Sequence, residues 1–532
     1  MYRVRIVFAV WIVLAAGTRS RAQSFADVDV PLEHAAYDIL IRFETRVALG
    51  RSFLDARPWT RGEVALLVQR FAQAAEARAW LPSALETQQL KQLELEFGTD
   101  LPDAGLQPFS RAFHVWEGSG WRLRAFWQGG TEVTNSAAGI ASPRTGTLLR
   151  VEPAAALVIG SRITAVQQLS YRVRSGDDVL VGSADVRDGE AQYVFDARDR
   201  FAISRSVTPY VRATGGRWSG ELGRFRVRWG PGRYNALLLS DFTPPFDLAR
   251  VRLSLGPVRY THLAGQLRAA RFAGDPPLDE RYLAAHRLEW EAHPRLRLAL
   301  SEALVYGNRG LDLSYLNPIT VLFVTQANNG DVDNALASFD GRWIVMRGFS
   351  LYGEGVVDDL NLRRGLRHFG NKVALLSGAH WAAPFGVADW DFEAEWSWAG
   401  QFTYTHVRAV DRYQHFGGTL GSRVGPDAEF AIALLRRQLT RGWSASLFYE
   451  RVRRGEGRLE VDHDDRTSDL QEFLSGVVET THAPGIALRF RGLRTLDVDL
   501  EARVQTVHHP GHDAAAASRS SLAARAATRL EF

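Results

Sequence analysis

The sequence contains no cysteine, and Lys91 and Lys372 are its only lysines among 532 residues. The absence of cysteine excludes disulfide bonds, thiol catalysis and cysteine-ligated metals. It is typical of chains that avoid thiols in an oxidising compartment. Almost every basic residue is arginine, whose planar guanidinium suits carboxylates and sugar hydroxyls. The formal net charge is only +4, which gives no indication of nucleic-acid binding.

Long apolar runs are also missing after the N-terminus, so the mature chain is not expected to span a membrane with a helix. At the N-terminus itself, Arg3 and Arg5 precede a short apolar segment from Ile6 to Ala16. A small-x-small cleavage pattern, Ser20-Arg21-Ala22, follows this segment. These features predict a signal peptide over residues 1–22 and export of the chain.

Residues 23–108 show the period of amphipathic helices and predict a small periplasmic helical domain. Thr60 and Glu63 have the spacing of a capping box at the start of one helix. The apolar positions at helical spacing are Tyr37, Leu40 and Ile41, then Val64, Leu67, Val68 and Phe71, then Leu90, Leu93 and Phe97. A packed helical bundle without a ligand accounts for all of them.

The same segment resembles half of an S-layer homology repeat. The resemblance rests on Asp27-Val28-Asp29-Val30-Pro31, His34, Tyr37 and Pro58-x-Thr60-Arg61-x-Glu63. Such repeats hold cell-wall polymers, so the resemblance implies a contact with peptidoglycan, beside the simpler interpretation of a packed bundle.

From about Trp121 onward the hydrophobic pattern has a period of two, which is typical of strands. Apolar and aromatic residues alternate with charged or polar ones along 224–229, 390–398 and 496–505. A soluble sandwich would bury its apolar face. A barrel with apolar side chains toward lipid and charged side chains toward its interior accounts for both faces. The aromatic and apolar residues expected to face lipid include Phe225, Val227 and Trp229, and Trp390, Phe392 and Trp396.

The lengths of the connections between these strands alternate between short and long. Short connections are predicted at Gly160-Ser161, Thr214-Gly215-Gly216, Gly256-Pro257, His293-Pro294, Arg347-Gly348, Pro384 to Asp389, Thr440-Arg441-Gly442 and Gly492-Leu493-Arg494. Longer, polar connections lie between them, for example 306–335, 405–427 and 455–483. The pattern predicts a mainly β fold, an antiparallel transmembrane barrel of about eighteen strands over residues 109–532, with periplasmic turns and external loops.

The end of the chain fits the same prediction. Phe532 follows Leu530, Thr528, Ala526 and Ala524 at alternate positions. A last strand that ends in an aromatic residue resembles the assembly signal of outer-membrane proteins. We therefore expect the barrel assembly machinery and outer-membrane lipids as partners, and the Gram-negative outer membrane as the location.

Several sequence blocks resemble the Wzi family of capsule-assembly proteins. They are Trp229-Gly230-Pro231-Gly232 with Leu237-Leu238-Leu239-Ser240 and Pro245-Phe246; Asn317-Pro318; Gly330-Asp331-x-Asp333-Asn334-Ala335-Leu336 and Asp340-x-Arg342-Trp343; Tyr352-Gly353 and Asp358-Asp359; Gly370-Asn371-Lys372; and Tyr404-Thr405-His406, His415 and Leu420-Gly421-x-x-x-Gly425-Pro426. The resemblance covers roughly residues 220 to 430. It implies an eighteen-stranded surface lectin that holds capsular or extracellular polysaccharide and catalyses no reaction. The arginine-rich interior and the long loop at 455–483 depart from the family pattern.

A set of polar and aromatic residues is predicted to bind the polysaccharide. The aromatic candidates are Trp229, Tyr234, Trp343, Tyr404 and Tyr413, which fit either stacking on sugar rings or the aromatic belt at the membrane surface. Asp333, Asn334, Asp340 and Arg342 are expected to form one network at the rim of the barrel. Asp358 and Asp359 either bind sugar hydroxyls or pair with Arg363 and Arg364, because a half-buried carboxylate needs a partner.

Two clusters contain residue types that bind metals, yet no metal or other cofactor is predicted. Asp462-His463-Asp464-Asp465 and Asp469 offer oxygen ligands that suit calcium, but their spacing is not that of an EF-hand, so 462–469 is interpreted as a solvated loop. His508-His509-x-x-His512-Asp513 has transition-metal ligand types, and a flexible loop is again the preferred interpretation. No Gly-x-Ser-x-Gly, His-Glu-x-x-His or P-loop motif indicates an enzyme.

The alternative function is a diffusion porin whose helical domain grips the cell wall. The two functions differ in the interior of the barrel. The arginines expected to point inward are Arg224, Arg226, Arg228, Arg489 and Arg491, and the facing carboxylates are Glu393, Glu395 and Asp499. If these groups pair across the interior they obstruct the channel, which favours the polysaccharide-binding function over the porin.

Overall fold

The structure is a computed structural model of the chain. It describes residues 25–50, 52–100, 114–137, 144–176, 194–198, 201–268, 280–330, 332–359, 368, 371–416, 418–462, 470–492 and 496–531. The predicted signal peptide and the C-terminal Phe532 lie outside these residues.

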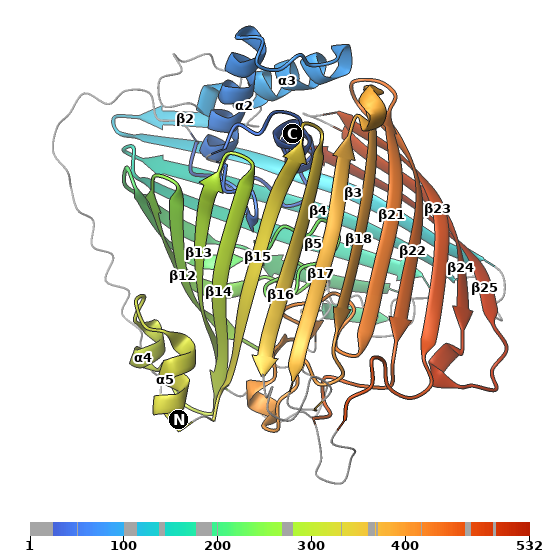
Figure 1. Ribbon diagram of the computed structural model, residues 1–532. Coiled ribbons are helices and arrows are strands. Elements are labelled where there is room, and N and C mark those ends of the chain that lie inside the picture. Colours follow the sequence, from blue (N-terminus) through green and yellow to red (C-terminus); the bar gives the residue numbers. More distant parts are fainter. Residues whose placement is uncertain are drawn as a thin grey trace.

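The described residues form a closed antiparallel barrel of eighteen wall strands, as predicted (Figure 1). β7 (Phe201–Val207) and β8 (Tyr210–Thr214) both pair with β5 and together count as one wall strand. The remaining wall strands are β3 (Trp121–Ala137), β4 (Arg144–Ile159), β5 (Ile163–Gly176), β9 (Trp218–Phe225), β11 (Phe246–Leu255), β12 (Val258–Leu267), β13 (Arg281–His293), β14 (Leu296–Gly307), β15 (Asn334–Met346), β16 (Phe349–Asp359), β17 (Lys372–Ala382), β18 (Trp390–Ala399), β21 (Ala428–Gln438), β22 (Trp443–Arg454), β23 (Glu479–Gly492), β24 (Leu496–His508) and β25 (Arg519–Glu531). Pairing of β25 with β3 closes the barrel.

Shorter elements complete the fold. The remaining strands are β1 (Ala56–Arg57), β2 (His114–Gly118), β6 (Val194–Arg198), β10 (Arg228–Trp229), β19 (Gln414–His415) and β20 (Gly418–Thr419). The helices are α1 (Ala36–Val47), α2 (Arg61–Glu76), α3 (Ala84–Phe97), α4 (Leu313–Leu316) and α5 (Leu322–Asn328). Short 3-10 turns lie at Gly98–Asp100, Pro384–Gly386, Ala409–Asp411 and Pro510–His512.

Strand β18 shows the predicted alternation of the wall. Asp391, Glu393 and Glu395 are buried and point into the barrel, whereas Phe392 and its neighbour Trp390 lie on the outer side. Apolar side chains on the outside and ionised side chains on the inside are the reverse of a soluble sheet, and match a barrel surrounded by lipid.

The prediction for residues 224–229 was wrong. Phe225, Val227 and Trp229 are buried inside the barrel instead of facing lipid. The physical reason is that β9 ends at Phe225 and the chain then leaves the wall, and it rejoins the wall only at Phe246, where β11 begins. Trp229 lies in β10, which pairs with β1 of the N-terminal segment. After the end of a wall strand, the alternation of apolar and charged residues therefore does not show which side chains face lipid.

The predicted tight connections gather at one end of the barrel, here called the short-turn end. Gly256-Pro257, for example, joins β11 to β12, and Arg347-Gly348 joins β15 to β16. The longer connections lie at the opposite, long-loop end. Two of them are not the polar external loops that were predicted, because 405–427 folds into the barrel interior and 306–335 lies against the outer wall.

The N-terminal helices agree with the sequence prediction. Thr60 and Glu63 form the capping box of α2: the Glu63 N–H donates to Thr60 Oγ1 over 3.1 Å, and the Thr60 N–H donates to Glu63 Oε2 over 2.8 Å. Phe43, Phe71 and Leu93 pack in one apolar core between the helices. In the part of the chain that the structure describes, no helix has the length and apolar character needed to cross a membrane.

The helical domain sits at the short-turn end and is tied to the barrel by buried ion pairs (Figure 1). Arg42 of α1 lies 2.9 Å from Asp391 of β18, and Arg212 of β8 lies 2.7 Å from Asp29. The Gly348 N–H in a short turn donates to the Thr45 carbonyl over 2.9 Å. Buried charges need partners, so these pairs fix the domain in the mouth of the barrel.

Candidate functional site

The chain between β9 and β11, residues 226–246, crosses the interior of the barrel and is here called the inner segment. Two buried wall carboxylates hold it through its backbone. Glu354 of β16 accepts the Leu237 N–H over 3.1 Å and the Leu238 N–H over 2.9 Å. Glu395 of β18 accepts the Asn235 N–H over 2.7 Å. Three backbone N–H groups of the inner segment thereby bond to buried side chains of the wall, so the inner segment is firmly attached to it.

Two glycines of the Wzi-like blocks are required by the close approach of backbones. A Cβ at Gly232 would lie 2.1 Å from the Asn235 carbonyl oxygen. A Cβ at Gly421 would lie 2.1 Å from the Leu237 carbonyl oxygen. Real side chains do not tolerate such distances. The absence of a Cβ at Gly232 permits the tight turn within the inner segment, and its absence at Gly421 lets residues 400–427 pack against the inner segment.

Residues 400–427 form a second segment that folds into the interior. Tyr404 donates its hydroxyl to the Leu237 carbonyl over 2.7 Å, and Tyr413 donates to the Leu238 carbonyl over 2.9 Å. The two rings are stacked with their centroids 5.8 Å apart. Burial raises the pKa of both phenols well above the usual value. The structure therefore places these two predicted sugar-stacking residues in the packing between the interior segments.

Four further predicted site residues also lie inside the barrel. Trp229 is buried, and the Tyr234 hydroxyl donates to Glu393 over 2.5 Å. Asp340 accepts two hydrogen bonds from Arg287, over 2.6 and 3.0 Å. Arg342 donates to Asp55 of the N-terminal segment over 3.1 Å. Asp340 and Arg342 do not lie at the rim with Asp333 and Asn334, because their strand runs from the long-loop end to the short-turn end.

The remaining candidates have separate environments. Asp333 accepts two hydrogen bonds from Arg309, over 2.8 and 2.6 Å, beside the buried Asn334. Trp343 is 51% exposed on the outer face, in agreement with the alternative of an aromatic belt. Arg363 lies outside the described residues, as does Arg364.

The predicted pairing of interior arginines is found in part. Arg489 and Arg491 of β23 lie 3.3 and 2.6 Å from Asp499 of β24. Glu393 pairs with Arg233 of the inner segment over 2.7 Å and with Arg436 over 3.5 Å. The other predicted arginines pair elsewhere: Arg224 with Asp247, Arg226 with Glu33 and Arg228 with Asp241. The interior is thus occupied by the inner segment, whereas direct pairs between opposite walls were predicted.

A cluster of charged and polar side chains lies at the long-loop end and is here called the outer polar cluster. Its members are Asp358, Asp359, Lys372, Thr405, His406, Arg408, Asp411 and Asp462. They come from β16, β17, the second interior segment and the loop after β22. The topology therefore joins residues that are far apart in the sequence.

Lys372 lies near the middle of the outer polar cluster. Its Nζ is 3.2 Å from Asp462 Oδ1 and 3.6 Å from Asp359 Oδ2. Thr405 donates its hydroxyl to Asp462 over 2.8 Å, and Asp358 accepts the Tyr404 N–H over 2.8 Å. The Asp359 side chain remains 59% exposed. One carboxylate of the cluster is therefore accessible while the others are held in place.

Asp411 supplies a second ion pair of the cluster. Arg408 Nε lies 2.8 Å from Asp411 Oδ2, and His406 Nδ1 lies 3.8 Å from the same oxygen. Burial raises the pKa of Asp411 to about 7, against the opposing effect of Arg408. Burial also lowers the pKa of His406. The charge of this part of the cluster therefore changes near neutral pH.

Lys372, His406, Arg408 and Asp411 were not predicted as site residues. A signal was present, because Lys372 is one of only two lysines and both Lys372 and His406 occur in the Wzi-like blocks. The separation of Lys372, on β17, from the segment that holds His406, Arg408 and Asp411 concealed the cluster, since only the closed barrel brings these parts of the chain together.

The two clusters of metal-binding residue types, which were interpreted as loops, are together described only in part. Within the described ranges, no three His, Cys, Asp or Glu side chains gather as potential metal ligands. His508 lies 2.7 Å from the Ser518 hydroxyl, and His512 lies 2.8 Å from the Val477 carbonyl. Of the acidic loop only Asp462 is described, and it contacts Lys372 and Thr405.

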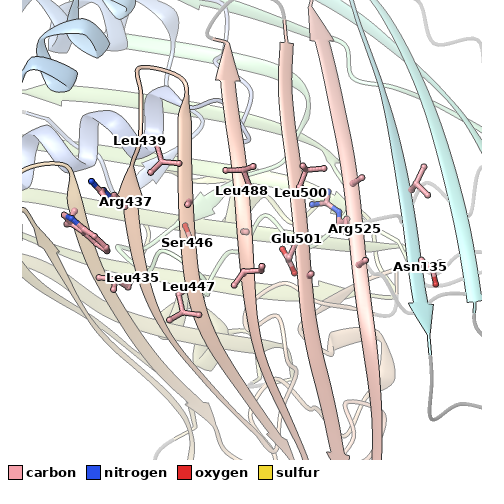
Figure 2. A pocket seen from close by; sticks show the side chains of 18 residues that line it. Asn135, Leu435, Arg437, Leu439, Ser446, Leu447, Leu488, Leu500, Glu501 and Arg525 are labelled. Atoms are coloured by element: carbon pink, nitrogen blue, oxygen red, sulfur yellow. The ribbon is translucent and has the colours of Figure 1, made fainter.

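A large hollow of about 820 Å³ is found on the outer wall across β21 to β25 and β3 (Figure 2). Leu435, Leu447, Leu488 and Leu500 lie along it in Figure 2, and several alanines also line it. Its lining is mainly apolar and faces the lipid side. It therefore suits hydrocarbon and offers few of the polar groups that recognise a sugar.

A closed barrel with an apolar outside and a charged inside defines an outer-membrane β-barrel protein. The protein is accordingly located in the outer membrane. The family model described as capsule assembly protein Wzi matches residues 183–520, which is more than half of the chain. The chain belongs to the Wzi family of capsule-assembly proteins.

A solved structure similar to this chain has the same fold. The chain is similar to Wzi of Escherichia coli, described as an outer-membrane protein involved in group 1 capsule assembly and a carbohydrate-binding β-barrel. The identity is 13%, the match covers 95% of this chain and 99% of that one, and the TM-score is 0.59. The outer-membrane protein OpdK of Pseudomonas aeruginosa matches at 10% identity over 77% of this chain and 98% of that chain, with a TM-score of 0.44. No curated protein sequence matches the chain.

Proposed function

We propose that the protein binds exported capsular or extracellular polysaccharide at the cell surface, and thereby helps to assemble and attach it without catalysing a reaction. Membership of the capsule-assembly family is the observation that carries this proposal. The carbohydrate binding described for the similar E. coli barrel supports it.

The outer polar cluster is the proposed contact site. Charged side chains and hydroxyls that converge at the long-loop end offer donors and acceptors for sugar hydroxyls. Asp359 and Arg408, which are 59% and 36% exposed, are the members most accessible to a ligand. Among the residues predicted from the sequence, Asp358 and Asp359 belong to this site, and Arg363 remains a candidate in the adjacent loop. A repeating polymer could then bind through many weak contacts.

The interior residues have a supporting role in this proposal. Tyr404 joins the inner segment to the outer polar cluster, because its hydroxyl bonds Leu237 while its N–H bonds Asp358. Glu354 and Glu395 fix the inner segment to the wall. A binding site supported in this way is held on rigid elements, which keeps its geometry fixed.

The other predicted partners and the domain division belong to the same proposal. We propose that the short-turn end faces the periplasm, so that residues 23–108 form a periplasmic domain after removal of residues 1–22. Outer-membrane lipids and the barrel assembly machinery, through the last strand, remain proposed partners. Peptidoglycan is the partner for which there is least support, because Asp29 of the S-layer-like motif already pairs with Arg212 of the barrel.

The test compares cells that express the protein with cells that lack it, by measuring polysaccharide bound to the cells and shed into the medium. We expect the deletion to shift polysaccharide from the cells to the medium. The double variant Asp359→Asn with Arg408→Gln should reproduce this shift, whereas Arg441→Gln, an exposed arginine in a short turn at the opposite end, should not. Unchanged attachment in the deletion strain would contradict the proposal.

The porin alternative makes a different prediction. Residues 226–246 cross the interior and are bonded to Glu354 and Glu395 on neighbouring regions of the wall. We therefore expect little steady ion flow through the purified protein in planar bilayers. Large and stable conductance steps would favour the porin over the polysaccharide-binding function.

A further inference from the structure

The connection between β14 and β15 contains a helical hairpin, residues 311–328, that lies against the outside of the barrel. Figure 1 shows α4 and α5 beside the lower end of β14, and α5 contacts both β14 and β15. Tyr315 and Leu322 of the hairpin pack on Leu304 of β14. Leu304 alternates with inward residues and shares the outer face with Leu300, which is 58% exposed. The hairpin is therefore outside the wall.

The exposed side of the hairpin is mainly apolar. No charged residue occurs from Leu313 to Gly330, in a chain of which 23% of the residues are charged. On α5, Leu322 and Gln326 are buried one helical turn apart, whereas Phe323 and Val324 are 57% and 55% exposed. The other exposed apolar side chains are Leu311, Leu313, Ile319 and Val321. A contiguous surface of this kind is unfavourable in water.

The hairpin lies at a level where the wall itself faces lipid. The Leu322 N–H donates to Glu302 over 2.8 Å, and Glu302 is two positions from Leu300 on the same outer face. Phe339 pairs with Leu300 across β14 and β15 and is 55% exposed. The apolar side of the hairpin is thus continuous with the lipid-facing surface.

A row of polar side chains lies on the same outer face. His262, His286 and Glu302 are direct neighbours across β12, β13 and β14. The two imidazole rings are 4.8 Å apart, and both are buried, although they point away from the barrel interior. In the described part of the chain, His262 Nδ1 and His286 Nε2 have no hydrogen-bond partner. Tyr260 donates its hydroxyl to the Pro318 carbonyl of the hairpin.

These polar groups need a cover, because ionisable side chains facing hydrocarbon are unfavourable. The hairpin supplies one, since it bonds Glu302 and Tyr260 on one side and presents mainly apolar side chains on the other, with no charged residue from Leu313 to Gly330. Arg309 and Tyr315 both donate hydrogen bonds to Asp333 at the base of the hairpin. The bond from the Tyr315 hydroxyl to Asp333 is 2.7 Å long. The cover is therefore attached to the wall at several points.

We propose that residues 311–328 are a lipid-contact element whose exposed side binds fatty acyl chains of the outer leaflet and whose other side covers the polar row. Any lipid of that leaflet with such chains fits, because the surface has no charge that would select a headgroup. The proposal depends on the position of the barrel in the membrane and is independent of polysaccharide binding.

The absence of cysteine permits a clean test with single labelled cysteines in the full chain. The variants Val324→Cys, Leu447→Cys on the lipid-facing wall, and Leu81→Cys, which is 73% exposed in the helical domain, are each labelled with an environment-sensitive fluorophore. Each is placed in phosphatidylcholine vesicles with or without bromine on the acyl chains. Heat-dependent migration on gels confirms that each barrel is folded.

We expect brominated chains to quench the label at position 324 about twofold, as at position 447, because both lie in hydrocarbon. Aqueous iodide should quench position 81 and spare position 324. Quenching of position 324 by iodide alone would overturn the proposal. Quenching by neither reagent would also overturn it, and disulfide-linked dimers of unlabelled Val324→Cys would then identify a second copy of the chain as the cover.

Discussion

Arg297 of β14 and Asp55 of the N-terminal segment form a buried ion pair, with 3.0 Å between Nε and Oδ2 across 242 residues of sequence. Arg342 of β15 reaches the other oxygen of the same carboxylate over 3.1 Å. Burial opposes ionisation of Asp55, but Arg297 and Arg342 hold its pKa well below the usual range. One carboxylate thereby links the helical domain to two neighbouring wall strands.

The first prediction concerns removal of this carboxylate. Asp55→Ala should lower the free energy of unfolding by about 3–5 kcal/mol, because it removes the carboxylate partner of the buried Arg342 and one of the two carboxylate partners of the buried Arg297. Urea unfolding followed by fluorescence measures the change. Glu94→Gln on the exposed side of α3 is the matched control and should unfold like the unmodified protein. Equal unfolding of both variants would show that the ion pair contributes no stability.

The second prediction concerns pH and Asp411. The pKa of Asp411 is raised to about 7 in the folded protein. Between about pH 4 and pH 7, the folded protein therefore keeps a proton on Asp411 that the unfolded chain has already released. This group therefore favours the folded state more strongly as the pH falls through that window. Asp411→Asn should remove this part of the pH dependence, measured as the change in urea midpoint between about pH 8 and pH 5. Asp513→Asn, at an exposed position, should leave it intact.

The third prediction concerns the contact between the two interior segments. Gly421→Ala places a methyl group against the Leu237 carbonyl and the Tyr404 ring, so it should cost about 1–3 kcal/mol of stability. Displacement of the inner segment should also raise ion conductance in planar bilayers. Gly216→Ala, where nothing lies within 4 Å of the added carbon, is the control. Unaltered conductance and stability in Gly421→Ala would contradict this packing.

The fourth prediction concerns the lipid-facing wall. Leu447→Arg introduces a charge in the apolar hollow of Figure 2 and should cost about 2–4 kcal/mol when the barrel folds into vesicles. Leu439→Arg, in the same hollow but directly after β21 at the short-turn end, should cost about 0–1 kcal/mol. Urea titrations in vesicles of one lipid composition compare the two. A larger loss for Leu439→Arg would mean that the membrane does not surround the wall as described.

Much of the fold could be predicted from the sequence because its signals are local. Alternation along β18 and the capping box of Thr60 and Glu63 depend on residues only a few positions apart. Short turns such as Gly256-Pro257 can also be recognised from adjacent residues. Strand number, closure and the three N-terminal helices follow from such signals without knowledge of long-range contacts.

The candidate site could be predicted only in small part, because the contacts that define it are long-range. The sequence does not show that β9 ends at Phe225, so the aromatic residues after it were assigned to lipid. Tyr404 looks like a sugar-stacking residue until its hydroxyl is found on the Leu237 carbonyl. Lys372 and Asp462 become partners only when the barrel closes. When a segment distant in the sequence buries polar residues, the hydrophobic periodicity of the sequence does not change, so this burial cannot be predicted from the pattern.

The attachment of the helical domain has a consequence for biogenesis. Asp29, Arg42 and Asp55 each bind a different sector of the wall, on β8, on β18 and on β14 with β15. These sectors are assembled from chain that is synthesised long after the N-terminal segment. The N-terminal segment can therefore complete its docking only after β18, the last of these three sectors in the sequence, has joined the wall.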